Sequence, residues 1–392
     1  MKVIAINAGS SSLKFQLLNM PEETVISSGQ VEKIGAIDAI FTIKFNGEKF
    51  ERILKISNHA VAVDLLLKGL IEHGVIKTVE EIEGVGHRIV QGGEIFQESA
   101  VINEDVLEKV EKLASLAPLH NLAHAIGIKA FLEALPNVFQ LAVFDTVFHQ
   151  TMPEEAYLYA TPYEWYQKYA IRKYGFHGTS HQFVSQEAMK LLKNPKAKVI
   201  VCHIGNGVSI TAVDAGKSID TSMGLTPLEG VPMGTRSGNI DPAVLGLVQE
   251  REGKTLRELL EDLNKKSGYL GVSGVSNDSR DIAKAAEEGN HRADLAMRIQ
   301  AKRIVDYIGS YYVRLKGLDA LVFTAGIGEN SGQVREMIVS QLGVLGIKLD
   351  TKLNLQRGVI GEISTKDSKA KVFVIPTNEE VMIAREVYSR LV

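Results

Sequence analysis

Cysteine is almost absent from this sequence of 392 residues, in which Cys202 is the only one. One cysteine cannot form an intramolecular disulfide, and with its neighbour His203 it supplies too few ligands for a structural zinc site. Long apolar runs are lacking as well, because no stretch approaches the roughly 20 residues that a membrane-spanning helix needs. A disulfide-stabilised secreted domain, a cysteine-based zinc protein and a helical membrane protein are therefore disfavoured.

A surplus of charge of one sign is also missing. The 44 Lys and Arg residues nearly balance the 47 Asp and Glu residues, which gives a formal net charge of −3 at pH 7. Since no segment is strongly basic, we expect neither nucleic acid nor a membrane surface as a partner. The first residues lead directly into an apolar strand without a charged leader, so we expect a soluble cytoplasmic protein. The length is sufficient for about two domains.

What the sequence does contain is a recurring unit, a short apolar run that ends abruptly in polar or glycine-rich residues. Helical patterns separate these runs, such as the apolar residues spaced three or four apart after Asn103. Strands that alternate with helices predict an α/β protein, in which ligands bind beyond the carboxyl ends of the strands. We therefore expect the polar residues after the runs to converge on one site. The runs are 3–6, 82–86, 141–144, 199–202, 321–324 and 372–375.

A partial internal repeat relates the two halves of the chain. Residues 3–17 (VIAINAGSSSLKFQL) resemble residues 199–213 (VIVCHIGNGVSITAV), and each is a strand, a turn of small residues and a second strand. Two similar halves that face each other would place two glycine-rich turns on either side of one cleft. We predict a first domain at 1–147, to which a closing helix at 380–392 returns, and a second, nucleotide-binding domain at 148–379.

The first of these turns, Gly9-Ser10-Ser11-Ser12, has two interpretations. It is an ordinary hairpin turn, or it is a phosphate-binding loop whose backbone N–H groups and hydroxyls face an anion, with Lys14 adding charge. It is not a Walker loop, because the pattern GxxxxGK[ST] does not occur here. The matching turn Gly205-Asn206-Gly207 favours phosphate binding.

A third glycine-rich segment, Gly326-Ile327-Gly328-Glu329-Asn330, follows an apolar strand and precedes a helical stretch. A turn of this kind suits a nucleotide, but it is equally compatible with the plain start of a helix. The GxGxxG pattern is not satisfied, so a Rossmann dinucleotide site is disfavoured.

Two arginines lie between glycines, Arg88 in HRIVQGG and Arg236 in MGTRSG. The planar guanidinium binds carboxylate or phosphate oxygens through two hydrogen bonds. A surface ion pair is the alternative for each arginine. The neighbouring glycines favour a place in a cleft, because they let the backbone turn there.

Other polar residues follow apolar runs or stand near them. Asp145 either caps a turn or acts on a charged centre or a metal-bound water. Glu379 is either a first-turn acid that complements the helix dipole or a residue that orients Mg²⁺ through water. His177 and His181 are four residues apart, as in a helical metal pair, but Gly178 and the lack of a nearby third ligand favour a His177 that donates to an anion.

In order along the whole chain, these motifs resemble those of the acetate kinase (acetokinase) family, which has the actin/Hsp70/sugar-kinase fold. The resemblance implies a duplicated, ribonuclease H-like α/β fold with two domains flanking a nucleotide cleft, and a homodimer. It also implies reversible, Mg-ATP-dependent phosphorylation of acetate to acetyl phosphate by direct in-line transfer. The motifs are INAGSSSLK, HRIVQGG, PLHN, FDTVFHQTMP, YGFHGTSH, HIGNG, TPLEG, MGTRSG, SNDSRD, AGIGEN and TNEE.

The resemblance implies roles for single residues in the reaction. Arg88 resembles the arginine that binds the acceptor carboxylate, and Asp145 resembles the catalytic aspartate. His177 and Arg236 resemble the residues that stabilise the transition state. The positions that match the small methyl pocket of the family are Val90, Leu119, Phe176 and Pro227.

Cofactor contacts follow in the same way. Asn7 and Glu379 resemble the pair that orients Mg²⁺, with Mn²⁺ as an alternative metal. The sequence departs from the family pattern at Gln91, where many members have His, and at Asn239, where many have Asp. Ser279 stands where a larger apolar residue is common beside the adenosine, which puts nucleotide selectivity in doubt. The residues that resemble ATP contacts are Lys14, His203, Ile204, Gly205, Asn206, Gly207, Asp278, Ser279, Arg280, Gly326, Ile327, Gly328, Glu329 and Asn330.

Other functions of this fold stay open on sequence grounds. A propionate or short-chain acyl kinase is the nearest alternative, because one methylene in an apolar pocket is worth only about 1–3 kcal/mol. A small apolar pocket suits a short acid better than the polyol of a sugar kinase. In a nucleotide-driven binding module, chaperone-like or actin-like, Arg88 and Asp145 would have no role.

Overall fold

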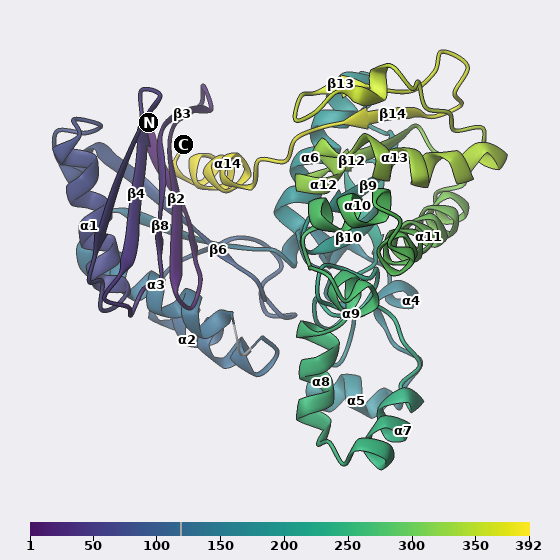
Figure 1. Ribbon diagram of the computed structural model, residues 1–392. Coiled ribbons are helices and arrows are strands. Elements are labelled where there is room, and N and C mark those ends of the chain that lie inside the picture. Colours follow the sequence, from purple (N-terminus) through teal and green to yellow (C-terminus); the bar gives the residue numbers. More distant parts are fainter. Residues whose placement is uncertain (118–119) are drawn as a thin grey trace. The chain divides into compact units, whose positions relative to one another are not determined.

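Five of the six apolar runs lie within β-strands of the computed structural model, which describes residues 1–117 and 120–392, and the sixth, 372–375, extends one residue beyond its strand. The chain divides into two units (Figure 1). Unit 1 comprises Met1–Val147 and Asn378–Val392, and unit 2 comprises Phe148–Thr377. The chain therefore passes from unit 1 to unit 2 after Val147 and returns to unit 1 at Asn378.

Unit 1 is built on an eight-stranded sheet of order β5-β4-β3-β2-β1-β6-β8-β7. Neighbours from β5 to β1 are antiparallel, β1, β6 and β8 are parallel, and β7 pairs with β8 in the antiparallel sense. The strands are β1 (Lys2–Ala8), β2 (Ser12–Asn19), β3 (Thr24–Glu32), β4 (Ala39–Phe45), β5 (Glu48–Leu54), β6 (Ile82–Ile89), β7 (Ala100–Val101) and β8 (Phe139–Phe144).

Helices pack on the sheet of unit 1, and glycines in one strand make room for the last of these helices. The helices are α1 (His59–Glu72), α2 (Glu104–Lys112), α3 (Asn121–Ala134) and α14 (Glu379–Leu391), with short 3-10 turns at Val79–Glu81 and Leu113–Ser115. Helix α14 lies against β6 (Figure 1), where Gly84 and Gly86 leave room for it. A Cβ atom on these glycines would lie 2.5 Å from Val387 Cγ1 and 2.3 Å from Ile383 Cγ2, so side chains there would push the helix away.

Unit 2 is built on a six-stranded sheet of order β11-β10-β9-β12-β14-β13. Its strands are β9 (Lys198–Ile204), β10 (Val208–Asp214), β11 (Lys217–Thr221), β12 (Ala320–Thr324), β13 (Gly361–Glu362) and β14 (Lys371–Val374). Its helices are α4 (Glu154–Tyr157), α5 (Tyr163–Tyr169), α6 (Gly178–Leu192), α7 (Ala243–Glu252), α8 (Leu256–Lys265), α9 (Gly268–Ser273), α10 (Ser279–Glu287), α11 (His291–Leu315), α12 (Ala325–Asn330) and α13 (Gly332–Val339). Shorter 3-10 turns lie at Val147–Thr151, which begins at the unit boundary, Ser340–Leu345 and Leu353–Leu355.

The same five-strand arrangement occurs in both sheets. In β3-β2-β1-β6-β8 and in β11-β10-β9-β12-β14, the first three strands are antiparallel and the last three are parallel. The repeated segments 3–17 and 199–213 are the matching hairpins β1–β2 and β9–β10. The predicted duplicated, ribonuclease H-like α/β fold is therefore confirmed.

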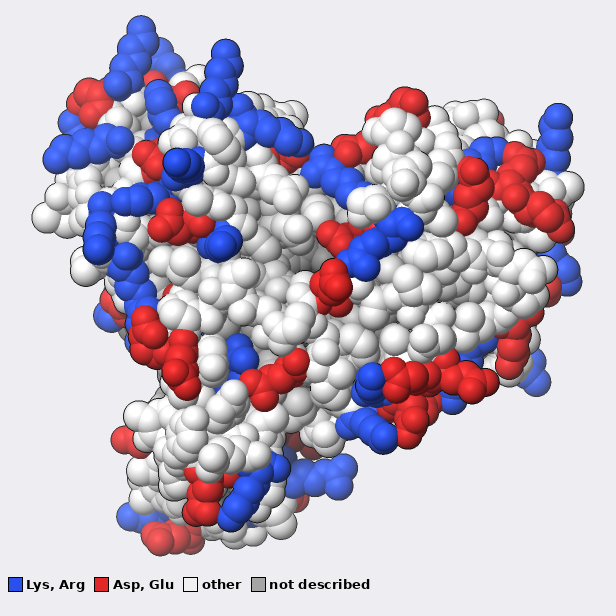
Figure 2. All heavy atoms as spheres, turned by 180° about the vertical axis from the view of Figure 1, so that it is seen from behind, with Lys and Arg blue, Asp and Glu red and all other residues white. Residues whose placement is uncertain are grey.

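The exposed surface carries charge of both signs. On the face shown in Figure 2, groups of Lys and Arg alternate with groups of Asp and Glu, and neither sign covers the whole face. Among the helices of the described residues, none has the length and apolar character needed to cross a membrane.

Candidate functional site

An arginine–aspartate pair lies at the carboxyl ends of two parallel strands of unit 1. Arg88 is the last residue but one of β6, and Asp145 follows β8 directly. Arg88 Nε and Nη2 donate to Asp145 Oδ1 and Oδ2 at 2.9 and 2.7 Å. The Asp145 side chain is 2% exposed and that of Arg88 is 18% exposed. Arg88 therefore does not form a surface ion pair, the alternative that the sequence left open. Asp145 fixes the plane of the guanidinium through two parallel hydrogen bonds.

Burial and charge act against each other on this pair. Burial disfavours the charged guanidinium, but the carboxylates of Asp145 and Glu379 outweigh it and raise the pKa of Arg88 above its ordinary value. Burial also disfavours the charged form of Asp145 and therefore raises the pKa of its carboxyl group. The charge and hydrogen bonds of Arg88 oppose that rise. Because a guanidinium does not release its proton in a protein, the pair exists as guanidinium and carboxylate at neutral pH.

The start of helix α14 brings more negative charge to Arg88. Asn378 caps this helix by accepting a hydrogen bond from Val381 N at 3.1 Å. Glu379 follows as the first helical residue, and its Oε2 lies 3.6 Å from Arg88 Nη1. Burial, and then the charge of Glu379, raise the pKa of Glu380. One guanidinium thus faces two carboxylates directly, which leaves an excess of negative charge.

Asn7 lies in the strand beside Arg88, and Lys14 lies on the other strand of its hairpin. Strand β1 runs parallel to β6 with Ile6 opposite His87, so Asn7 and Arg88 are the next residues of these two neighbouring strands. Asn7 is itself paired with Lys14 of β2, an exposed residue, across the turn at 9–12. That turn is a hairpin turn, as one of its two interpretations required.

Asn7 and Glu379 offer oxygen ligands of the kind that Mg²⁺ prefers, and the excess of negative charge near Arg88 suits a cation. In the described part of the chain, no group of three or more His, Cys, Asp or Glu residues is arranged to hold a metal ion. In proteins, Mg²⁺ is commonly held by one or two carboxylates together with retained waters and phosphate oxygens. The residues present therefore fit a magnesium ion bound with its own waters.

The residues predicted to form the methyl pocket are divided between the units. Val90 follows β6 and is half-buried in unit 1, whereas Phe176 is buried and Pro227 half-buried in unit 2. Leu119 lies outside the described residues. Next to Val90, the buried side chain of Gln91 accepts a hydrogen bond from Gly93 N at 2.9 Å, which fixes the glycine turn after β6. The apolar pocket itself stays a prediction.

A glycine turn in unit 2 brings two predicted catalytic side chains together. Gly205, Asn206 and Gly207 connect β9 and β10, and Gly205 N donates to Gly207 O at 3.0 Å. A Cβ atom on Gly207 would lie 3.3 Å from His177 Nε2 and 3.7 Å from Arg236 Nη1. His177 and Arg236 therefore both reach the same turn, and glycine keeps the space between them open.

Arg236 is a partly buried cation that forms no ion pair with a carboxylate in the described part of the chain. Its Nη1 donates to Pro227 O at 3.3 Å and contacts Met233 Sδ at 3.5 Å. Among the described residues, no Asp or Glu forms an ion pair with it, and burial lowers its pKa. The guanidinium stays protonated, since its ordinary pKa is above 12. A partly buried cation of this kind is suited to bind an anion.

His177 and His203 stack on each other beside this turn. Their ring centroids are 4.1 Å apart and the planes are inclined by 20°. His177 has a left-handed backbone (φ 56°) just before α6, and its Nδ1 lies 2.8 Å from Ser209 Oγ. His181 Nε2 lies 2.6 Å from the same hydroxyl. Both rings therefore face a serine rather than a shared metal position, which disfavours the helical metal pair.

A pocket of about 1060 Å³ lies in unit 2, slightly above the usual range of small-molecule sites. It is lined by residues from the glycine turn, from α10 and from α12. Eight of the predicted ATP contacts line it, namely Gly205, Asn206, Asp278, Ser279, Arg280, Gly326, Ile327 and Asn330. The lining does not include Lys14, which belongs to unit 1, or His203, Ile204, Gly207, Gly328 and Glu329 of unit 2.

Two of the predicted nucleotide-binding motifs in the pocket belong to helices, one at the start of α10 and the other within α12. Asp278 caps α10 by accepting from Arg280 N at 2.8 Å, and the hydrogen bonds from Arg280 lower the pKa of Asp278 to about 2. The segment Gly326–Asn330 is not a turn before a helix, because it belongs to helix α12. Arg335 holds the end of this helix by donating from Nη1 to Gly328 O and Glu329 O at 2.8 and 3.0 Å.

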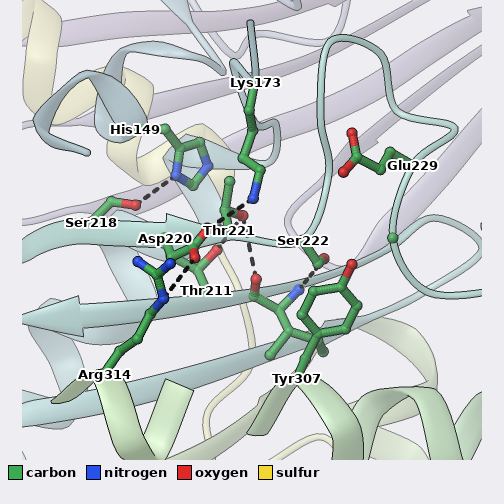
Figure 3. A network of polar contacts seen from close by, with 12 residues as sticks. His149, Lys173, Thr211, Ser218, Asp220, Thr221, Ser222, Glu229, Tyr307 and Arg314 are labelled. Atoms are coloured by element: carbon green, nitrogen blue, oxygen red, sulfur yellow. Dashed lines mark hydrogen bonds and ion pairs between the residues drawn. The ribbon is translucent and has the colours of Figure 1, made fainter. Parts of the chain in front are cut away.

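No quoted motif contains Lys173, Asp220 or Arg314, which form part of the polar network that holds the segment leading into His177 (Figure 3). Lys173 Nζ donates to Asp220 Oδ1 at 2.9 Å, and Arg314 Nε lies 3.4 Å from Asp220 Oδ2. These three residues come from the loop before α6, from β11 and from α11. Because they are far apart in the sequence, only a prediction of tertiary contacts would have grouped them.

His149 completes the support of this segment. Its Nδ1 lies 2.9 Å from Ser218 Oγ, as Figure 3 shows, and its Nε2 lies 3.0 Å from Phe176 O. Burial lowers the pKa of His149 to about 4, so the ring is neutral near pH 7. A neutral imidazole donates through one nitrogen only. Since Phe176 O can only accept, Nε2 donates to it and Nδ1 accepts from Ser218.

Comparison with known proteins gives one consistent family. The model of the acetokinase family matches residues 2–385. The acetate kinase of Acholeplasma laidlawii is 64% identical over 388 residues, which cover 99% of this chain and 98% of that protein. The crystal structure of Porphyromonas gingivalis acetate kinase is 46% identical with a TM-score of 0.96, and covers 100% of both chains. The structure of a propionate kinase from Francisella tularensis is 44% identical with a TM-score of 0.94, and covers 99% of both chains.

Proposed function

Because this chain belongs to the acetokinase family, we propose that it catalyses the reversible, ATP-dependent phosphorylation of acetate to acetyl phosphate. The observation that carries the proposal is the pair of His177 and Arg236 over the Gly205–Gly207 turn. Arg236 is partly buried and forms no ion pair with a carboxylate among the described residues, and two residues of the same turn line the pocket of unit 2. A cation beside a nucleotide-sized pocket suits the transfer of a phosphoryl group.

We assign the nucleotide to unit 2. Its pocket is large enough for an adenosine, and backbone N–H groups of the glycine turn suit phosphate oxygens. Ser279 lies in the lining, where a small hydroxyl leaves more room than a large apolar side chain. His177 and Arg236 would stabilise the equatorial oxygens of the transferring phosphoryl group during direct in-line transfer.

We assign the acceptor carboxylate to Arg88 in unit 1. Asp145 takes Nε–H and one N–H of Nη2, and Glu379 lies 3.6 Å from Nη1, so the other N–H of Nη2 and those of Nη1 are the donors that could bind acetate. Acetate is a carboxylate at neutral pH and has no proton to lose, so the reaction needs no general base in this direction. Asp145 therefore acts by orienting Arg88 and by setting the charge around it.

Asn7 and Glu379 would hold the metal ion that accompanies ATP, either Mg²⁺ or Mn²⁺. When bound, the ion neutralises negative charge on the phosphate oxygens. The contribution of this chain is the pair of oxygen ligands and the position of Glu379, which is fixed by the cap of α14 and by Arg88.

Purified protein assayed by hydroxamate trapping of acyl phosphate tests the proposed function. We expect ATP-dependent product with acetate, a smaller yield with propionate and butyrate, and none with glycerol. A preference for propionate would move the chain toward the propionate kinases, one of which it resembles at 44% identity. ATP hydrolysis without acyl phosphate would contradict the proposal and favour a nucleotide-driven binding module.

We also propose that the protein is a homodimer that uses helices α7 and α8. These helices pack on each other, and no residue of α7 is buried. They expose Val244 and Leu247 on α7 and Leu256 and Leu260 on α8, which is unusual for a surface that faces only water. An apolar surface of this kind is typical of an interface between copies of one chain.

The variant Leu247→Asp is expected to weaken the dimer, because it places a charge on a surface that would be desolvated on association. Light scattering after size-exclusion chromatography measures the mass. Val344→Asp is the control, since Val344 is 91% exposed and lies outside α7 and α8. A monomeric wild-type protein, or a Leu247→Asp variant that stays dimeric at low concentration, would contradict this interface.

A further inference from the structure

Four histidine rings lie close together in unit 2, and one of them has no role in the proposed function. His177 and His181 come from the start of α6, His203 from β9, and His149 from the turn after β8. The ring of His181 lies 5.7 Å from that of His149, 6.0 Å from that of His203 and 6.4 Å from that of His177. His181 is fully buried, so whatever it does must act through its neighbours.

A single hydroxyl connects His181 to His177. Ser209 Oγ lies 2.8 Å from His177 Nδ1 and 2.6 Å from His181 Nε2, and Ser209 is fully buried. A serine hydroxyl carries one proton, so it donates to one of these nitrogens and accepts from the other. Two arrangements are therefore possible. Ser209 donates to His177 and accepts from His181, or it donates to His181 and accepts from His177.

The second nitrogen of His181 decides between them. His181 Nδ1 is buried and has no hydrogen-bond partner within the described structure. If Ser209 donated to His181 Nε2, the neutral ring would carry its proton on Nδ1, as a buried N–H without an acceptor. Buried N–H groups without partners are rarer in proteins than acceptors without partners. The favoured arrangement is therefore His181 Nε2–H to Ser209 Oγ, and Ser209 Oγ–H to His177 Nδ1.

We propose that His181 and Ser209 are positioning residues that keep His177 in its neutral form with the proton on Nε2. This is the nitrogen that lies beside the Gly205–Gly207 turn, where an added Cβ of Gly207 would be 3.3 Å away. The inference rests on the proposed function, in which His177 donates to the transferring phosphoryl group. A proton on Nδ1 would leave Nε2 as an acceptor, and this nitrogen would then repel the phosphoryl oxygens.

The same chain of hydrogen bonds resists protonation of His177. A charged His177 would donate from Nδ1, so Ser209 would turn its proton to His181 and force the proton of that ring onto its partnerless Nδ1. The groups packed around His177 oppose a second positive charge as well. Arg236 is a cation at the same glycine turn, and His203 stacks on the ring. Behind them, burial lowers the pKa of His149 and of His181, and Lys173 adds a further opposing charge near His149.

Nitrogen NMR of the full-length protein labelled with ¹⁵N-histidine tests the tautomer without any enzyme assay. The signals of His177 are assigned by their loss in the variant His177→Gln. We expect a neutral ring with the proton on Nε2 between pH 6 and pH 8, near the ordinary histidine pKa of about 6.5. A proton on Nδ1, or an imidazolium at pH 7, would overturn the proposal. This result stands even if the protein proves not to phosphorylate acetate.

The variant Ser209→Ala then tests the cause. We expect His177 to lose its fixed tautomer. We also expect kcat for acetate phosphorylation to fall by roughly tenfold or more and to depend on pH below 7, with the KM for ATP unchanged. The variant Ser209→Thr keeps the hydroxyl and is expected to restore both readouts.

Variants of His181, at the other end of this series of hydrogen bonds, test the proposal independently in case Ser209→Ala does not fold. His181→Gln offers an amide N–H in place of Nε2–H and is expected to retain the His177 tautomer, whereas His181→Leu is expected to lose it. An unchanged His177 spectrum in both Ser209→Ala and His181→Leu would overturn the proposal. Circular dichroism of each variant shows whether it is folded.

Discussion

Replacing Arg236 with alanine is expected to lower kcat by roughly 1000-fold while the KM for ATP changes little. The guanidinium has no carboxylate partner among the described residues, so its charge is free to act on the phosphoryl group as that group is transferred. Removing one such charge from a water-poor site costs about 100-fold to 1000-fold in rate. The nucleotide itself is held by the remaining lining of the pocket, so its binding is largely kept. Steady-state kinetics with ATP and acetate measure both parameters.

Two further variants sharpen this test. Arg236→Lys keeps the charge but loses the planar fork, so it is expected to recover only part of the rate. Arg298→Ala is the control, because Arg298 is an exposed arginine on α11 that pairs with Asp294 at 2.7 Å. A near-normal kcat for Arg236→Ala would remove this residue from the reaction and leave it a structural role only.

Replacing Asp145 with asparagine is expected to reduce kcat by roughly 100-fold or more and to raise the KM for acetate. The amide can accept only one of the two hydrogen bonds that now fix the Arg88 guanidinium, and it offers Arg88 an NH₂ group in place of the second acceptor. The change also leaves the partly buried Arg88 with Glu379, 3.6 Å away, as its nearest counter-charge. Breaking a buried ion pair in this way destabilises a protein by about 3 kcal/mol. Kinetics and urea unfolding measure the two effects.

Asp294→Asn serves as the matched control for Asp145→Asn. It removes one partner of the exposed pair Arg298–Asp294 and is expected to change neither the kinetics nor the urea midpoint appreciably. If Asp145→Asn lost stability but kept its KM for acetate, Asp145 would support the fold of unit 1 without orienting a substrate-binding arginine.

Residues that end strands were the ones the sequence could predict. A short apolar run followed by Asp145 or by a glycine turn marks a strand and the position where it ends, and both features depend on neighbouring residues alone. The repeat at 3–17 and 199–213 added the duplication of the fold. The helical pattern predicted after Asn103 is α2, and Asn103 caps it by accepting from Val106 N at 2.8 Å.

Residues that support the site from a distance could not be predicted. Lys173 and Asp220 are 47 positions apart, and each looks like an ordinary surface charge in its own segment. The same holds for Ser209, whose partners His177 and His181 are 32 and 28 positions away. Pairs of this kind form only after the sheet and α6 have packed, so no local pattern contains them.

Helix α12 shows a second limit of local patterns. A segment with two glycines in six residues has a low intrinsic tendency to be helical. In the folded protein, Arg335 donates to the carbonyl groups of Gly328 and Glu329, and the helix contacts β9. Tertiary packing thus outweighs the propensity of the segment, and the sequence alone left both a turn and the start of a helix open.

The place of α14 in unit 1 has a consequence for synthesis on the ribosome. Residues of unit 2 form one continuous segment, 148–377, whereas unit 1 needs α14, which is translated after all of unit 2. Until α14 has emerged, Gly84 and Gly86 of β6 expose backbone and apolar surface that the helix later covers. Nascent chains therefore complete unit 2 first, and during that interval the open face of β6 is a surface for chaperones to bind or for neighbouring chains to aggregate upon.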